Sequence, residues 1–73
     1  MSEVVVHAFK KNRREEVRAT LDVFKGVSVA NVRIFVGDSE GEMRATPKGI
    51  TLRVEQLPEL RQAVDALIAR AAS

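Results

Sequence analysis

The chain contains no cysteine, tryptophan or tyrosine, and His7 is its only histidine. Disulfides, a structural zinc site and a catalytic Cys–His set are therefore excluded. We interpret His7 as an ordinary strand residue, because one histidine without ordered partners rarely supports catalysis. No apolar run approaches the ~20 residues that span a bilayer, and the start of the chain lacks the pattern of a signal peptide. We expect a cytoplasmic protein that is not an enzyme, with no metal, cofactor, small-molecule substrate or membrane partner.

The chain is also short. Its 73 residues are enough for one domain, which we assign to residues 1–73. A chain of this size buries only about 60% of the surface that it exposes when unfolded. Small domains usually compensate with disulfides, a metal or a partner chain. Because the first two are excluded, the sequence favours an oligomer.

Basic residues are unevenly distributed, although the net charge is only +2. Residues 10–53 contain ten basic and six acidic side chains, whereas residues 54–73 contain two basic and three acidic ones. This distribution favours an anionic partner for one part of the surface.

Four segments have the composition or alternation of β-strands. They cover residues 4–9, about 16–24, 27–36 and 43–54. The segment 37–42 has turn residues at both ends, which predicts a hairpin. Pro47 and Gly49 predict a kink, an edge or a bulge in the fourth strand, because proline cannot donate to the ladder.

The hydrophobic period changes near residue 54. Apolar residues then recur at three- and four-residue spacing, which predicts an amphipathic helix that starts near residues 54–57, with Pro58 in its first turn. The predicted fold is therefore α+β, with a four-stranded antiparallel sheet followed by one C-terminal helix. We expect the helix to cover one face of the sheet and to leave the other face open.

The apolar stripe of the helix allows two interpretations. Most such stripes form the core of their own domain. This one is broad and belongs to a domain too small for a full core, which favours a homodimer joined through the helices. We assign to the dimer interface Leu57, Leu60, Val64, Leu67 and Ile68.

The sheet face away from the helix combines basic and aromatic side chains. By alternation this face includes Arg18 and Phe24 of the second strand, and Arg33 and Phe35 of the third. Proteins that bind single-stranded nucleic acid pair a cationic track with aromatic platforms for the bases. A charged face that is only solvated explains the same residues, so the alternation leaves both interpretations open.

Three motifs in this region resemble one known family. They are F-K-G at residues 24–26, V-R at 32–33, and G-E-M-R-A-T-P-K-G-I-T-L at 41–52. Their joint spacing resembles the single-strand-binding domain of the transcriptional coactivator family called positive cofactor 4, over about residues 18–68. The compact chain is most similar to the bacterial members of that family.

This resemblance implies a homodimer of β-β-β-β-α subunits, joined largely through the helices, with curved channels that hold single-stranded DNA or melted duplex. Carried over by position, Phe24 stacks on bases, and the phosphate contacts are Lys25, Arg33, Arg44 and Lys48. Gly26 and Gly49 shape the channel. Our predicted nucleic-acid-binding set is completed by Arg18, Phe35, and the loop residues Lys10, Lys11, Arg13 and Arg14.

One departure concerns stacking, because Val36 stands where the eukaryotic coactivators have a tryptophan. We predict that Phe35 compensates if its strand presents it to the channel. The predicted function is sequence-tolerant binding of single-stranded DNA at the nucleoid, in transcription regulation, replication or repair, with the transcription machinery as a further candidate partner. Two alternatives remain, an RNA-binding protein of the same fold and a structural or protein-interaction dimer.

Overall fold

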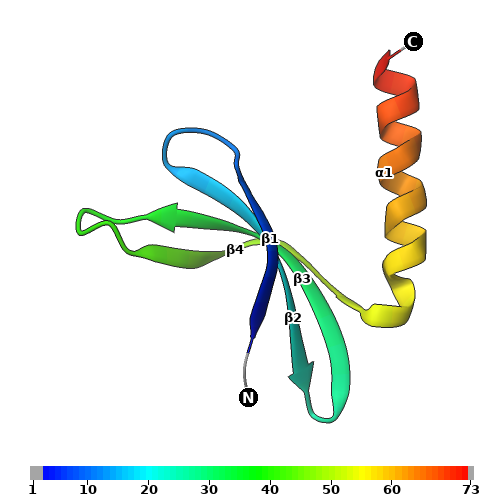
Figure 1. The fold of residues 1–73 in the computed structure, drawn as a ribbon, viewed down its shortest axis with the longest axis horizontal. Coiled ribbons are helices and arrows are strands. Elements are labelled where there is room, and N and C mark those ends of the chain that lie inside the picture. The colour runs from blue at the N-terminus through cyan, green and yellow to red at the C-terminus, as the bar shows by residue number, and fades with distance from the viewer. Residues whose placement is uncertain (1–2, 73) are drawn as a thin grey trace.

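The computed structural model describes residues 3–72, which form one antiparallel sheet and one helix (Figure 1). Strands β1 (Val4–Lys10), β2 (Glu15–Phe24), β3 (Val27–Gly37) and β4 (Met43–Arg53) lie in the sheet in chain order. A 3₁₀ turn, η1 (Val54–Gln56), leads into α1 (Leu57–Ala72). The predicted α+β fold and the positions of its elements are confirmed. No helix within residues 3–72 has the length and apolar character needed to cross a membrane.

The sheet is strongly twisted and curved. Figure 1 shows the β1–β2 and β3–β4 hairpins pointing to one side of the molecule, while the β2–β3 hairpin points to another. Adjacent strands of a sheet rotate with a fixed hand, and this rotation accumulates across four strands. The predicted hairpin between β3 and β4 is confirmed, with residues 38–42 connecting the two strands.

The register confirms two chemically different faces. We call one the apolar face; across β2 and β3 its facing pairs are Val17 with Ile34, Ala19 with Val32, and Leu21 with Ala30. We call the other the polar face; its facing pairs are Glu16 with Phe35, Arg18 with Arg33, Thr20 with Asn31, Asp22 with Val29, and Phe24 with Val27. Because side chains alternate along a strand, this separation follows directly from the alternation in the sequence.

A bulge interrupts β4 where an irregularity is predicted. Ala45 faces Phe35 and Gly49 faces Arg33, so residues 46–48 lie opposite the single residue Ile34. Gly49 has φ +150°, and a Cβ built on it would lie 2.4 Å from the Val32 carbonyl oxygen and 2.7 Å from the Arg33 Cα. Only glycine permits this approach of β4 to β3, so Gly49 shapes the sheet beside Arg33.

A two-residue turn joins β2 to β3. Phe24 pairs with Val27, and the two residues between them have positive φ, 51° for Lys25 and 78° for Gly26. Positive φ at both central positions defines a type I′ turn, whose twist matches that of a hairpin. Glycine adopts this conformation readily, whereas a lysine does so at a cost.

The prediction that α1 covers one sheet face is wrong. Leu57, its first residue, lies beside the apolar face, but Figure 1 shows the rest of α1 projecting away from the sheet. Every residue from 61 to 72 is exposed. The physical reason is that η1 turns the chain away after β4, so the helix and the sheet of one chain do not cover each other.

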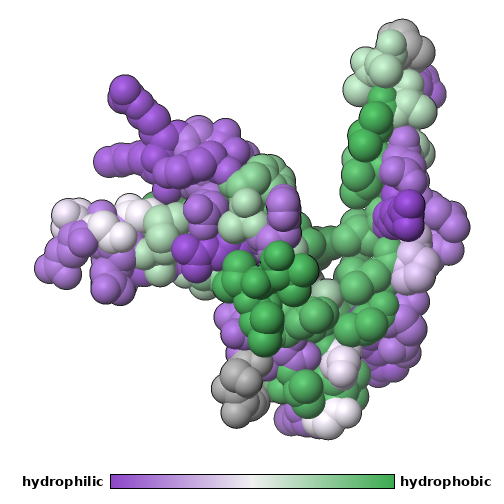
Figure 2. Space-filling model, in the orientation of Figure 1, coloured by the Kyte–Doolittle hydropathy of each residue, from purple (hydrophilic) through white to green (hydrophobic). Residues whose placement is uncertain are grey.

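Little of the chain is buried. Among the described residues, only Thr20 and Ala30 are buried, with 3% and 8% of their full exposure. Figure 2 shows hydrophobic residues gathered over the middle of the sheet and along the side of α1 turned toward it. A single chain therefore leaves its apolar face and its helix stripe largely open to solvent.

Candidate nucleic-acid interface

The centre of the polar face holds two arginines on neighbouring strands. Arg18 of β2 and Arg33 of β3 are direct cross-strand partners, and both are half-buried. The Arg18 Nε lies 2.5 Å from the Glu16 Oε1, and its guanidinium lies 4.6 Å from the ring centroid of Phe35. Arg18 is thus held by one carboxylate and one aromatic ring.

Arg33 is held by neutral groups. Its guanidinium donates to the Thr46 carbonyl oxygen at 3.2 Å and to the Thr51 Oγ1 at 3.0 Å. The Thr51 hydroxyl in turn donates to the Asn31 Oδ1 at 2.5 Å. No carboxylate within residues 3–72 forms an ion pair with Arg33. This guanidinium is fixed in direction while its charge is uncompensated.

This pairing of two arginines has an energetic consequence. Like charges directly opposite each other in an antiparallel pair destabilise the sheet. Glu16 offsets one of the two charges, and a bound anion beside Arg33 would offset the other. The planar guanidinium suits phosphate because it offers several donors in a fixed arrangement.

The β2–β3 end of the polar face presents an aromatic ring and a lysine. Phe24 is 61% exposed, and the Lys25 Nζ lies 5.4 Å from the centroid of its ring. Phe24 also borders a shallow hollow on the polar face, lined in addition by Asp22, Val29, Asn31 and Thr51. An exposed ring beside polar groups and a cation can stack on a base.

Phe35 lies on the polar face as predicted, but it is half-buried. The Arg18 guanidinium covers one side of its ring. Phe35 therefore packs against the arginine pair, and Phe24 is the more accessible of the two rings.

The structure does not bring every predicted phosphate contact to this face. Arg44 faces Val36, so it lies on the side of β4 opposite to Ala45 and Phe35, where its Nε lies 3.3 Å from the Asp38 Oδ2. Lys48 is exposed within the bulge of β4. Arg44 is thus separated from the arginine pair by the thickness of the sheet.

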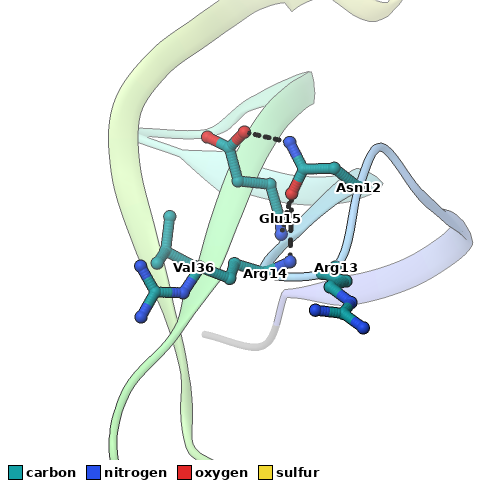
Figure 3. A pocket seen from close by; sticks show the side chains of 5 residues that line it. All are labelled: Asn12, Arg13, Arg14, Glu15 and Val36. Atoms are coloured by element: carbon teal, nitrogen blue, oxygen red, sulfur yellow. Dashed lines mark hydrogen bonds between the residues drawn. The ribbon is translucent and has the colours of Figure 1, made fainter.

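The remaining predicted bases lie in and beside the β1–β2 loop. Lys10 faces Glu16 at the end of β1, and Lys11 forms an ion pair with Glu15 at 3.4 Å. Arg13 and Arg14 are exposed and border a hollow with Val36 (Figure 3). These four bases form a cluster at the end of the sheet farthest from the β2–β3 turn.

Two carboxylates organise the loops at this end. Hydrogen bonds from the Asn12 side chain, and then from Lys11, lower the pKa of Glu15, and the charge of Lys48 contributes to the same shift. Backbone N–H groups of Glu42 and Glu40 lower the pKa of Asp38. The ionised form of Glu15 is therefore stabilised by the β1–β2 loop that precedes it, and that of Asp38 by the β3–β4 loop.

Comparison with known protein families gives one match that covers most of the chain. The family described as Transcriptional Coactivator p15 (PC4) matches residues 4–63, which is most of the chain. The chain belongs to the PC4 family. Among curated proteins, no significant relative was found.

Solved structures of PC4 homologues have the same fold. A PC4 homolog from Burkholderia pseudomallei, solved in orthorhombic and tetragonal crystal forms, is 26% identical over 94% of this chain, with a TM-score of 0.82 in both forms. The match covers 90% and 98% of the respective chains. A bacteriophage T5 homolog of eukaryotic PC4, implicated in recombination-dependent DNA replication, is 19% identical over 97% of this chain and 80% of its own, with a TM-score of 0.71.

Three residues that position basic side chains of this PC4-type sheet are not in the set predicted from the sequence. Asn31 and Thr51 hold Arg33, and Asn12 holds the basic loop. Alternation along β3 already places Asn31 on the face of Arg33. Thr51 needs the β3–β4 register, which the bulge alters, and Asn12 needs the geometry of the loop.

Proposed function

We propose that this chain binds single-stranded DNA with little sequence preference, acting as a homodimer at the nucleoid in transcription, replication or repair. The observation that carries the proposal is the open polar face, where Arg33 has no acidic partner within residues 3–72 and lies across from Arg18. Membership of the PC4 family supports it.

The chemistry of the polar face suits a single strand better than a duplex. Phosphates are attracted by the arginine pair and by Lys25, and an unstacked base can lie on the exposed Phe24 ring. A base within a duplex has its faces covered by its neighbours and cannot use this ring. The replication role named for the phage T5 homologue fits a ligand of this kind.

The dimer is proposed from the exposed apolar surface. Val64, Leu67 and Ile68 are 44%, 69% and 62% exposed, and Ile50 of the sheet is 45% exposed. Soluble monomers rarely expose large contiguous apolar patches. A second copy brings an identical helix stripe and an identical open sheet face, so a two-fold arrangement covers both at once.

A salt titration of oligonucleotide binding tests the proposed function. A labelled oligo-thymidine is titrated with the protein between ~50 mM and ~200 mM salt, since release of counterions makes phosphate binding weaken steeply over this range. Competition by duplex DNA and by RNA of matched length measures the preference, and the mass in solution measures the oligomeric state. Affinity that does not change with salt would refute a phosphate track, and tighter binding of RNA would favour the RNA alternative.

A further inference from the structure

The β1–β2 loop carries the densest positive charge of the chain. Four of the five residues 10–14 are basic. Within residues 3–72 only Lys11 of these four forms an ion pair, with Glu15. Figure 2 shows hydrophilic side chains extending from this end of the molecule, so Lys10, Arg13 and Arg14 present uncompensated charge to solvent.

Asn12 holds this loop in one conformation. Its Oδ1 accepts hydrogen bonds from the backbone N–H groups of Arg14 at 3.0 Å and Glu15 at 2.9 Å. Its Nδ2 donates to the Glu15 Oε1 at 2.7 Å (Figure 3). The Gly37 N–H donates to the Arg14 carbonyl oxygen at 3.1 Å, which fastens the loop to β3. Holding like charges close together costs free energy, and the ordered loop is preorganised for a polyanion.

Arg13 and Arg14 stand between two hollows. One is lined by Asn12, Glu15 and Val36 besides the two arginines. The other contains Lys10 and residues of the β3–β4 loop, including Asp38. Figure 3 shows the Arg14 side chain extending alongside Val36, while the Arg13 guanidinium points away from it. Arg14 therefore lies on the Val36 side of the sheet and Arg13 points away from it, so a phosphate backbone that turns around the loop can contact both guanidinium groups.

Resting on the proposed function, we propose that the β1–β2 loop is a second, mainly ionic contact region, and that Asn12 is its positioning residue. A strand that follows β2 meets Phe24 and Lys25 first and the arginine pair next. It reaches the loop after the ten residues of β2, a path of about 30 Å at ~3.3 Å per residue. Only a strand long enough to cross the polar face therefore contacts the loop.

The test compares two probe lengths. We measure the binding of two oligo-thymidine probes as a function of salt concentration. One has about six nucleotides, which is within the usual site size of one single-strand-binding sheet, and the other has about 20, which exceeds it. For Arg13→Ala/Arg14→Ala, the slope of log affinity against log salt should fall by about 1.4 on the long probe, for two lost contacts at ~0.7 each. On the short probe the slope should fall by less than half as much. The matched control is Arg61→Ala/Arg70→Ala, which removes the same charge from α1 and should leave both slopes unchanged.

A second variant separates position from charge. Asn12→Ala keeps all four basic residues but removes the three side-chain hydrogen bonds that order the loop. The affinity for the long probe should fall about fivefold, which corresponds to the net free-energy contribution of one hydrogen bond. Equal slope changes on both probes, or no change on either, overturn the inference for the loop. If the wild-type protein binds neither probe in a salt-dependent way, the proposed function itself is wrong. Wild-type affinity in Asn12→Ala removes Asn12 from the proposal.

Discussion

Lys25 occupies the first central position of a type I′ turn with φ 51°, a conformation in which lysine is uncommon. Asparagine followed by glycine is a preferred sequence for such a turn. Backbone strain at a single residue is often found where function requires the side chain. Under the proposed function, binding requires the Lys25 ammonium group beside the exposed Phe24 ring.

Replacing Lys25 by asparagine should therefore separate folding from binding. Lys25→Asn is expected to raise the free energy of unfolding by about 0.5–1 kcal/mol, because asparagine tolerates the left-handed conformation better. The same variant should bind oligo-thymidine more weakly, with a salt slope lower by about 0.7. Chemical unfolding and the salt titration measure the two effects, and a variant that is less stable than the wild type contradicts the assignment of strain.

Arg33 and Phe24 should give different signatures. Arg33→Ala removes one phosphate contact, so affinity falls uniformly across sequences and the salt slope falls by about 0.7. Phe24→Ala removes a stacking surface worth about 1–3 kcal/mol per base, so affinity falls while the slope stays nearly unchanged. The opposite pattern would show that the stacking and ionic roles have been exchanged.

At the scale of the elements, the bulge in β4 sets the surroundings of Arg33. Gly49 lets β4 approach β3 closely, and the extra residues opposite Ile34 bring the Thr46 carbonyl oxygen to the Arg33 guanidinium. The bulge in β4 therefore helps to set the direction of the Arg33 guanidinium, which is one of the proposed phosphate contacts.

Gly49→Ala should destabilise the protein by about 1–3 kcal/mol or more, because its Cβ would overlap with the Val32 carbonyl and the Arg33 backbone. Gly41→Ala is the matched control, since Gly41 also has a positive φ, +83°, but a Cβ there meets nothing within 4 Å. Urea unfolding of both variants distinguishes the overlap from the cost of backbone conformation alone. Equal losses of stability in the two variants would contradict the close approach.

The two hairpin loops should respond to acid. Glu15 and Asp38 have pKa values below their ordinary 4.5 and 3.8 because each accepts hydrogen bonds within its loop. A lowered folded pKa means that the ionised carboxylate stabilises the fold above its ordinary pKa and that this contribution is lost as the pH falls through the lowered value. Stability should therefore decline as the pH falls below the ordinary pKa values of the two carboxyls, and Glu15→Gln should show a shallower decline. Thermal unfolding across this pH range measures both.

At the scale of the whole molecule, one chain leaves most of its apolar surface uncovered. The sheet has one apolar face, α1 has one apolar stripe, and the two do not pack against each other (Figures 1 and 2). Burial of apolar area is the main favourable term in folding. The proposed second copy thus belongs to the stability of the fold as well as to the binding surface.

Leu67→Glu tests the proposed dimer interface, because Leu67 is 69% exposed in one chain. If Leu67 stayed exposed, the substitution would change stability by less than about 0.5 kcal/mol. In the proposed dimer it places an unpaired charge in an apolar interface, so the mass in solution should fall to that of one chain and the unfolding temperature should drop. Arg61→Ala, on a different side of α1, is the control and should remain dimeric; an unchanged mass for Leu67→Glu contradicts the helix interface.

Local patterns in the sequence were enough to predict the elements, the two faces of the sheet and the irregularity at Pro47 and Gly49. Each of these follows from a local property, namely the period of the side chains, the turn residues and the missing proline N–H. The resemblance in the segment from Phe24 to Leu52 was likewise enough to predict the family that the PC4 match confirms.

The position of the helix and the meeting of particular basic side chains depend on the three-dimensional structure. α1 stands away from the sheet because a short turn, η1, sets its direction, and no periodicity in the sequence encodes that direction. Arg18 and Arg33 meet through strand register, whereas Arg44 faces Val36 on the opposite side of the sheet. Register and chain direction depend on contacts between residues far apart in the sequence, so a pattern within one segment cannot specify them.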